Sequence, residues 1–375
     1  MAGVYIHIPF CKQACNYCDF HFSTSLKKKD ELVNCLIHEI ELRKGELKNE
    51  VVETIYFGGG TPSMLSQSEI DVVIDAVYQN HSVISNPEIT LEANPDDLNE
   101  ATIEELRESK VNRLSIGVQS FFEDDLKLMN RAHNAQEAKE CLSLAVQHFE
   151  NISLDLIYGI PGLSNERWKE NIRTALSFGV PHISSYALTV EPKTALESQI
   201  KKGTVPPVND EQAQEQFDML VGELAFSGFI HYELSNFGKE NFFSKNNSAY
   251  WQGKSYLGIG PSAHSFNGKQ RGWNVRNNSK YITSIQKNEL PIERETLSET
   301  DQYNEYIMTG LRTIWGVSLD RVERVYGKTY LEYLRRQSDQ YIKQQLLYID
   351  KGKLKTTQKG KFLSDGIASD LFMLN

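Results

Sequence analysis

Apolar runs of strand length alternate with helical patterns through the first half of the chain. Between the runs, apolar residues recur at helical spacing, as at Leu32, Leu36 and Ile40, which would share one face of a helix. Strand and helix units that follow one another in this way predict an α/β fold with a parallel sheet and right-handed crossovers, curled into an open or closed barrel. The six predicted strands lie at residues 4–8, 54–57, 88–91, 113–118, 152–158 and 183–188.

The pattern changes after about residue 290, where the chain becomes mostly helical. Helices followed by a small hairpin resemble a winged helix. We therefore predict a core barrel over residues 1–235, a linker or extension over 236–290 and a mostly α C-terminal domain over 291–375. The C-terminal elements are predicted as helices at 303–314, 319–326, 330–347 and 362–371, with a short strand at 353–356.

Composition and charge narrow the class of protein. The net charge of −10 argues against nucleic acid as the main partner, and the excess of Lys and Arg near the C-terminus is too mild to change that. No apolar run has the length of a membrane span, and the first ten residues lack the features of a signal peptide. We expect a cytoplasmic protein that is not integral to a membrane, which leaves peripheral association open. Five cysteines, an odd number, favour a reducing compartment over a disulfide framework.

Three of the cysteines form a cluster directly after the first predicted strand. Cys11, Cys15 and Cys18 are spaced so that a short loop can point their thiolates at one small volume. A 4Fe–4S cluster and a structural zinc ion, with His21 as its fourth ligand, both suit such a triplet. The triplet alone favours neither.

The residues at the ends of the other predicted strands distinguish the iron–sulfur interpretation from the zinc interpretation. In a parallel barrel, functional groups gather where the strands end at their C-terminal side. Glycines and polar residues do follow the later strands, and a zinc knuckle would not explain that placement, so the iron–sulfur interpretation leads. The residues concerned are Gly58 to Pro62, Glu92, Asn94, Gln119, Ser120, Asp155, the segment 158–162 and Glu191.

The cysteine spacing, with Tyr17 before the third cysteine, resembles the radical S-adenosylmethionine (SAM) superfamily. The resemblance implies a partial (β/α)6 radical SAM barrel with a 4Fe–4S cluster on Cys11, Cys15 and Cys18. The iron that lacks a cysteine would bind SAM, and one electron would cleave it to a 5′-deoxyadenosyl radical. By the same resemblance, the residues that line the SAM pocket are Tyr5, Tyr17, Gly59, Gly60, Thr61, Glu92, Gln119, Arg131, Asp155, Ala187 and His264.

Specific roles follow from the resemblance for some of these residues. Gly59, Gly60 and Thr61 would hold the methionine amino group, and Glu92 would bind the ribose. Arg131 would pair with the methionine carboxylate.

Motifs along nearly the whole chain resemble the oxygen-independent coproporphyrinogen III oxidase family. That family contains true decarboxylases and a heme chaperone branch, HemW. Phe20 stands where the decarboxylases carry a fourth cysteine, and only four residues precede Tyr5, where they have a longer arm; both features favour the chaperone branch. The resemblance then implies heme as ligand, a heme-acceptor protein as partner and a reducing electron donor such as a flavodoxin. The matching segments are 5–11, 15–20, 58–62, 113–121, 232–237 and 258–266.

One motif departs from the chaperone branch. HemW proteins carry His-Asn-x-x-Tyr-Trp, which is linked to heme binding, and here Asn246 replaces the histidine. Asn247, Tyr250 and Trp251 remain as a candidate heme region. Because an amide is a poor ligand for iron, His264 is a further candidate for the axial ligand.

Two other functions stay open at this point. One is radical oxidative decarboxylation of the propionates of coproporphyrinogen III. The other is a zinc-stabilised nucleic-acid-binding protein.

Overall fold

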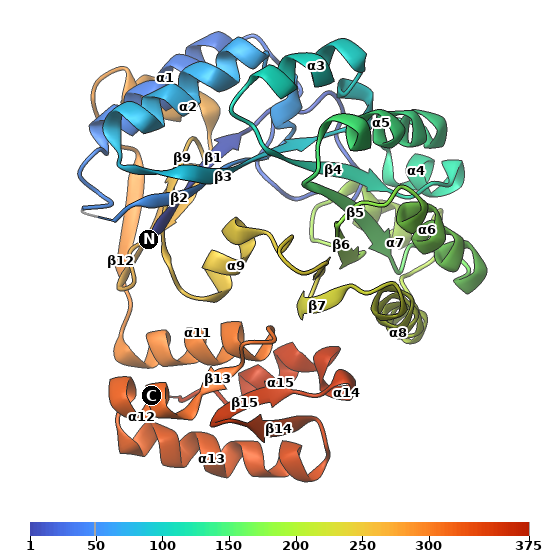
Figure 1. Ribbon diagram of the computed structural model, residues 1–375, viewed down its shortest axis with the longest axis vertical. Coiled ribbons are helices and arrows are strands. Elements are labelled where there is room, and N and C mark those ends of the chain that lie inside the picture. The colour runs from blue at the N-terminus through green and yellow to red at the C-terminus, as the bar shows by residue number, and fades with distance from the viewer. Residues whose placement is uncertain (49, 375) are drawn as a thin grey trace.

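The computed structural model describes residues 1–48 and 50–374. All six predicted strands are present: β1 (Ala2–Ile8), β2 (Val52–Gly59), β3 (Val83–Ala93), β4 (Arg113–Gln119), β5 (Ile152–Tyr158) and β6 (His182–Ala187). They lie side by side in chain order and run parallel within a twelve-stranded sheet (Figure 1). The predicted α/β fold with a partial (β/α)6 barrel is confirmed.

Helices cover the convex face of this curved sheet (Figure 1). Ser66 caps one of these helices, because its hydroxyl accepts a hydrogen bond from the Glu69 amide and the Glu69 carboxylate accepts one from the Ser66 amide. The apolar stripe of each helix packs on the sheet and builds one continuous hydrophobic core. The helices are α1 (Lys29–Leu42), α2 (Gln67–Asn80), α3 (Glu100–Glu108), α4 (Glu123–Met129), α5 (Ala135–His148), α6 (Asn165–Ser177), α7 (Ala195–Lys201) and α8 (Asp210–Phe226).

Residues 236–290, predicted as a linker or extension, widen the sheet at both edges. At one edge β8 (Asn236–Gly238) pairs with β6 and is followed outward by β7 (Ile230–Glu233). At the other edge a strand runs parallel to β1, and three antiparallel strands follow it. Leu257 and Ile282 belong to the barrel core, so this segment is part of the barrel. Its further elements are α9 (Lys245–Trp251), β9 (Ser255–Ile259), β10 (His264–Phe266), β11 (Gln270–Asn274) and α10 (Asn278–Ile285), and β12 (Ile292–Thr296) completes the edge.

The C-terminal part has a hydrophobic core of its own. The helix predicted for 330–347 ends at Lys343, because Gln345 adopts a left-handed conformation (φ 58°) and the chain turns into a strand. Leu346 and Leu347 are buried, and a buried leucine pair fits a helix and a strand equally well. The apolar pattern therefore did not show where the helix ends. The elements are α11 (Glu299–Leu311), β13 (Val317–Ser318), α12 (Leu319–Tyr326), α13 (Lys328–Lys343), β14 (Leu347–Asp350), β15 (Lys353–Thr356), α14 (Gln358–Lys361) and α15 (Ser364–Asp370).

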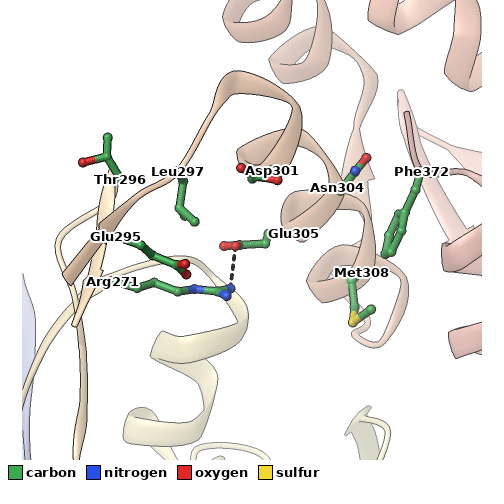
Figure 2. Close-up of a pocket in the computed structure, with 9 residues that line it drawn as sticks. All are labelled: Arg271, Glu295, Thr296, Leu297, Asp301, Asn304, Glu305, Met308 and Phe372. Carbon is green, nitrogen blue, oxygen red and sulfur yellow. Dashed lines mark ion pairs between the residues drawn. The ribbon is translucent and has the colours of Figure 1, made fainter. Parts of the chain in front are cut away.

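The C-terminal part lies against the edges of the barrel. At β7, the Lys361 ammonium lies 2.8 Å from Nδ1 of His231. At β11, Arg271 forms an ion pair with Glu305 of α11 at 2.5 Å. The pair lines a cavity of about 500 Å³ between the two parts. Figure 2 shows the pair together with Met308 and Phe372, which line the cavity from the C-terminal part. None of the predicted site residues lines this cavity.

No helix in the described ranges combines the length and the apolar character that a membrane crossing requires.

Candidate functional site

The cysteine loop follows β1 and is held in place by α4. The Asn16 amide donates to the Met129 carbonyl at 3.0 Å, and its side chain donates to the Leu128 carbonyl at 2.7 Å. Gln13 donates to the side chain of Asn130 at 2.8 Å, and Asn130 donates back to the Ala14 carbonyl at 2.8 Å. These four bonds fix the loop above the C-terminal ends of the strands.

The loop covers a cavity of about 450 Å³. Most residues that the sequence predicted for the cluster and for SAM line it, although they come from five different strands or strand ends, from the segment after α4 and from the loop itself. They are Cys11, Cys15, Tyr17, Cys18, Gly59, Gly60, Thr61, Glu92, Gln119, Arg131, Asp155 and Ala187.

The glycine segment after β2 packs directly under the cysteine loop. The Gly60 amide donates to the Ile8 carbonyl at 2.8 Å, and the Thr61 amide donates to the Phe10 carbonyl at 2.6 Å. A Cβ at Gly60 would lie 2.5 Å from the Phe10 carbonyl oxygen, which is too close for any other residue. Glycine is therefore required here for the approach of two backbones.

Two carboxyl groups face the cavity from β3 and β5. Glu92 accepts hydrogen bonds from the Tyr56 hydroxyl at 2.8 Å and from the Gly59 amide at 3.1 Å. Burial raises its pKa to about 7, and burial likewise raises the pKa of Asp155 to about 6. The Oδ1 atom of Asp155 is buried and has no hydrogen-bond partner in the protein. Such an acceptor suits a ligand that brings donors, as a ribose does.

Arg131 brings a buried cation to the cysteines. One of its terminal nitrogens donates to the Asn94 side chain at 2.7 Å and to the Gly117 carbonyl at 2.8 Å, and the other lies 3.4 Å from the Cys15 sulfur. Its Nε atom is buried and unpartnered. The guanidinium therefore has a remaining donor for an anionic group in the cavity.

The arrangement fits an iron–sulfur cluster with a bound nucleoside better than a zinc ion. Three thiols, two unpartnered buried polar atoms and a cavity of about 450 Å³ provide more room and more donors and acceptors than one ion uses. Burial raises the pKa of the Cys18 thiol to about 11. His21, the predicted fourth zinc ligand, instead has its Nε2 atom 2.6 Å from the Asn278 side chain. Within the described residues, no three His, Cys, Asp or Glu side chains form a site for a single metal ion.

Two residues predicted for the SAM pocket do not line this cavity. Tyr5 stacks on Tyr56 with ring centroids 6.0 Å apart, and its hydroxyl lies 3.3 Å from Nδ1 of His7. His264 lines a different cavity, next to Trp273.

The candidate heme region on α9 lies at the other end of the strands. The buried Asn246 accepts a hydrogen bond from the Thr54 hydroxyl at 3.0 Å, near the start of β2, and its amide donates to Glu88 at 3.1 Å. A Cβ on Gly3 would lie 3.3 Å from Oδ1 of Asn246, so the side chain is closely packed. Asn246 is therefore held in the packed interior near the start of β2.

The other residues of that region make aromatic contacts. The rings of Tyr250 and Tyr256 meet edge to face with centroids 4.6 Å apart. The Arg312 guanidinium lies over Trp251, 5.5 Å from the ring centre, so Trp251 joins the barrel to the C-terminal part. Asn247 donates its amide hydrogen to the Ser244 hydroxyl at 3.2 Å as part of the helix cap.

The sequence analysis missed several apolar side chains of the cysteine cavity. Ile157 follows Asp155 by two positions on β5, so strand alternation was a usable signal for it. Tyr186 is 44% exposed and Leu188 lies two positions further on. Phe22 comes from the cysteine loop, where no pattern predicted its direction.

Replacing Glu92 by glutamine is expected to flatten the pH dependence of stability. Because its pKa is raised to about 7, the folded protein keeps a proton that the unfolded chain has released. The resulting stabilisation is complete below about pH 4 and is lost as the pH rises through 7. Between pH 5 and pH 8 the free energy of unfolding of Glu92→Gln should fall by about 2 kcal/mol less than that of the parent. Urea unfolding across this range measures the difference.

The exposed Glu104→Gln is the matched control for this experiment and should follow the parent curve. Parallel curves for Glu92→Gln and the parent would show that Glu92 does not titrate in this range.

Comparisons with known proteins agree with this geometry. The model of the radical SAM superfamily matches residues 5–175, and that of the HemN C-terminal domain matches residues 297–363. A heme chaperone HemW from Bacillus subtilis (strain 168) is 33% identical over 371 residues, which are 98% of each chain. Another, from Lactococcus lactis subsp. lactis (strain IL1403), is 33% identical over 97% of this chain and 96% of its own.

A solved structure shows the same fold. The coproporphyrinogen III oxidase HemN from Escherichia coli, a radical SAM enzyme, superposes with a TM-score of 0.86 over 99% of this chain and 90% of its own, at 22% identity. That identity supports the fold alone, whereas the relatives at 33% identity cover both the barrel and the C-terminal part. The chain belongs to the HemW family of the radical SAM superfamily.

Proposed function

We propose that this protein is a heme chaperone that holds a 4Fe–4S cluster and SAM and passes heme to an acceptor protein. The similarity at 33% identity over 98% of the chain to a protein named heme chaperone carries the proposal. Phe20, which stands where the decarboxylases carry a fourth cysteine, lines the cysteine cavity and is 68% exposed.

The cluster would be held by Cys11, Cys15 and Cys18, which line one cavity. When bound, the cluster and SAM supply one-electron chemistry, for which a reducing protein such as a flavodoxin would be the donor. Arg131 lies 3.4 Å from the Cys15 sulfur and offers positive charge beside the thiolates. This charge would also suit the carboxylate of SAM, which is adjacent to the cluster in this family.

The nucleoside part of SAM would lie along the ends of β3 to β6. The unpartnered Oδ1 of Asp155 and the carboxylate of Glu92 would accept hydrogen bonds from ribose hydroxyls. Gly59, Gly60 and Thr61 would present backbone atoms to the methionine amino group, since no Cβ intervenes at the two glycines. Gln119 and Ala187 would contact the remainder from neighbouring strand ends, and Tyr17 would pack beside the cluster.

Heme titration of the anaerobically reconstituted protein tests the chaperone proposal. We expect saturable binding with a shifted Soret band, followed by loss of that band from this protein when an apo-hemoprotein acceptor is added. No Soret change on titration would overturn the proposal. Formation of protoporphyrinogen IX from coproporphyrinogen III, in the presence of SAM and a reductant, would instead establish the decarboxylase.

A further inference from the structure

We propose that heme binds in the cavity beside the cysteine loop that is lined by His264, Trp273, Arg276 and Lys280, with His264 as axial ligand. This inference rests on the proposed heme chaperone function and names the site for it. The cavity has a volume of about 640 Å³, lies between β10, β11, β12 and α10, and has Leu290 and Ile292 as apolar lining. This volume lies within the usual range for pockets that bind one small molecule or cofactor.

His264 is exposed. Its ring makes no hydrogen bond to any residue that the structure describes. Partial burial and the nearby charge of Arg271 lower its pKa, which favours the neutral form of the imidazole. A neutral imidazole with a free nitrogen is the side chain that most often ligates heme iron.

Trp273 provides a flat apolar surface next to this imidazole. The two residues are cross-strand partners on β10 and β11, so their side chains lie on the same face of the sheet. Their ring centres are 6.3 Å apart, at an angle of 34°. The Trp273 nitrogen donates to Glu293 at 3.2 Å, which fixes the ring. A porphyrin ligated by His264 would therefore have an aromatic neighbour of fixed orientation to pack on.

Two cations at the cavity suit the propionates of heme. Lys280 is exposed and forms no ion pair with any described residue. Arg276 is also exposed and donates to the backbone carbonyl of Asp19, which neutralises none of its charge. The single carboxylate of the lining, Glu293, is already hydrogen-bonded to Trp273. The lining thus offers charge-assisted bonds to an anionic ligand.

The position of this cavity agrees with a role next to the cluster. Asp19, the Arg276 partner, directly follows Cys18 and lines the cysteine cavity. His21, on the same loop, bonds to Asn278 at the start of α10. The proposed site is therefore joined to the cluster loop by two contacts, whereas Asn246 lies packed at the opposite end of the strands.

Replacing His264 by alanine tests the site. Heme affinity, measured by Soret titration of the reconstituted protein, should weaken about tenfold or more, and the Soret and electron paramagnetic resonance signatures of imidazole ligation should disappear. His148→Ala is the matched control, since its ring is also free of hydrogen bonds in the described structure, and it should bind heme like the parent. Iron-free protoporphyrin IX should bind parent and His264→Ala equally, because it needs no axial ligand.

A second pair of variants tests the propionate contact. Lys280→Ala should weaken heme binding about two- to fivefold at low salt, while the exposed Lys287→Ala on the following turns should not. If the parent binds heme and His264→Ala gives the same titration curve and spectra, the site is wrong and the chaperone function stands. If the parent itself binds no heme, both proposals fall.

Discussion

Replacing Cys15 by alanine is expected to leave the anaerobically reconstituted protein colourless, with iron and sulfide reduced from about four per chain to background. Cys15 lines the same cavity as Cys11 and Cys18, and the loop that carries all three is fixed to α4 by four hydrogen bonds. In this variant only two thiolates remain on the loop. No other cysteine can replace the missing ligand, because Cys35 and Cys141 are buried in the core.

Cys35→Ala is the control for this experiment. Cys35 belongs to α1 and is buried in the core, where its sulfur lies 3.9 Å from the Ile282 carbonyl oxygen. It does not line the cysteine cavity. This variant should keep the full iron content and the brown colour. Metal analysis by mass spectrometry and the visible spectrum measure both variants. One zinc per parent chain, or unchanged iron in Cys15→Ala, would contradict the assignment of the cluster.

Replacing Glu39 by alanine is expected to lower the free energy of unfolding by about 3–5 kcal/mol. Glu39 in α1 is fully buried and forms an ion pair with the equally buried Arg43 at 2.9 Å. It also accepts hydrogen bonds from the Gly260 amide at 2.8 Å, the Asn274 amide group at 2.8 Å and the Tyr281 hydroxyl at 2.6 Å. Its removal leaves a buried guanidinium without that partner and several donors unsatisfied.

The exposed Glu41→Ala, two positions along the same helix, is the matched control and should change stability by no more than about 0.5 kcal/mol. Urea unfolding followed by circular dichroism measures both variants. Equal midpoints for the two would show that the network around Glu39 adds nothing to stability. Because Gly260 and Asn274 adjoin the His264 cavity, Glu39→Ala should also weaken heme binding at that site.

The parallel strands were predictable because a strand buried on both faces is a short, continuous apolar run. Such a signal depends only on neighbouring residues, and it located β1 to β6 within a few positions. The strands β7 to β12, which extend the sheet beyond the six parallel strands, were missed, since they are short and their pairing depends on distant segments. The same limit explains why the helix predicted to 347 ends at Lys343: a buried leucine pair fits a helix or a strand equally.

Some residues of the cysteine cavity were also predictable from local sequence, whereas others were placed there by packing between distant segments. Strand ends meet at one edge of a parallel barrel whatever their sequence, so the positions of Gly59, Glu92, Gln119 and Asp155 in or near the ends of predicted strands were enough to predict that they lie together, and all four line one cavity. Arg131 follows α4, and its approach to Cys15 comes from the packing of α4 against the loop.

By itself, the sequence determined the α/β barrel, the three cysteines and the strand-end residues, because local apolar periodicity and topology set them. Only the tertiary structure decided that Asn246 is packed against Thr54, and that His264 opens into a cavity of its own with Trp273. The direction of a side chain outside the regular strands depends on contacts between segments that lie hundreds of residues apart or on opposite edges of a sheet, and no local pattern encodes those contacts.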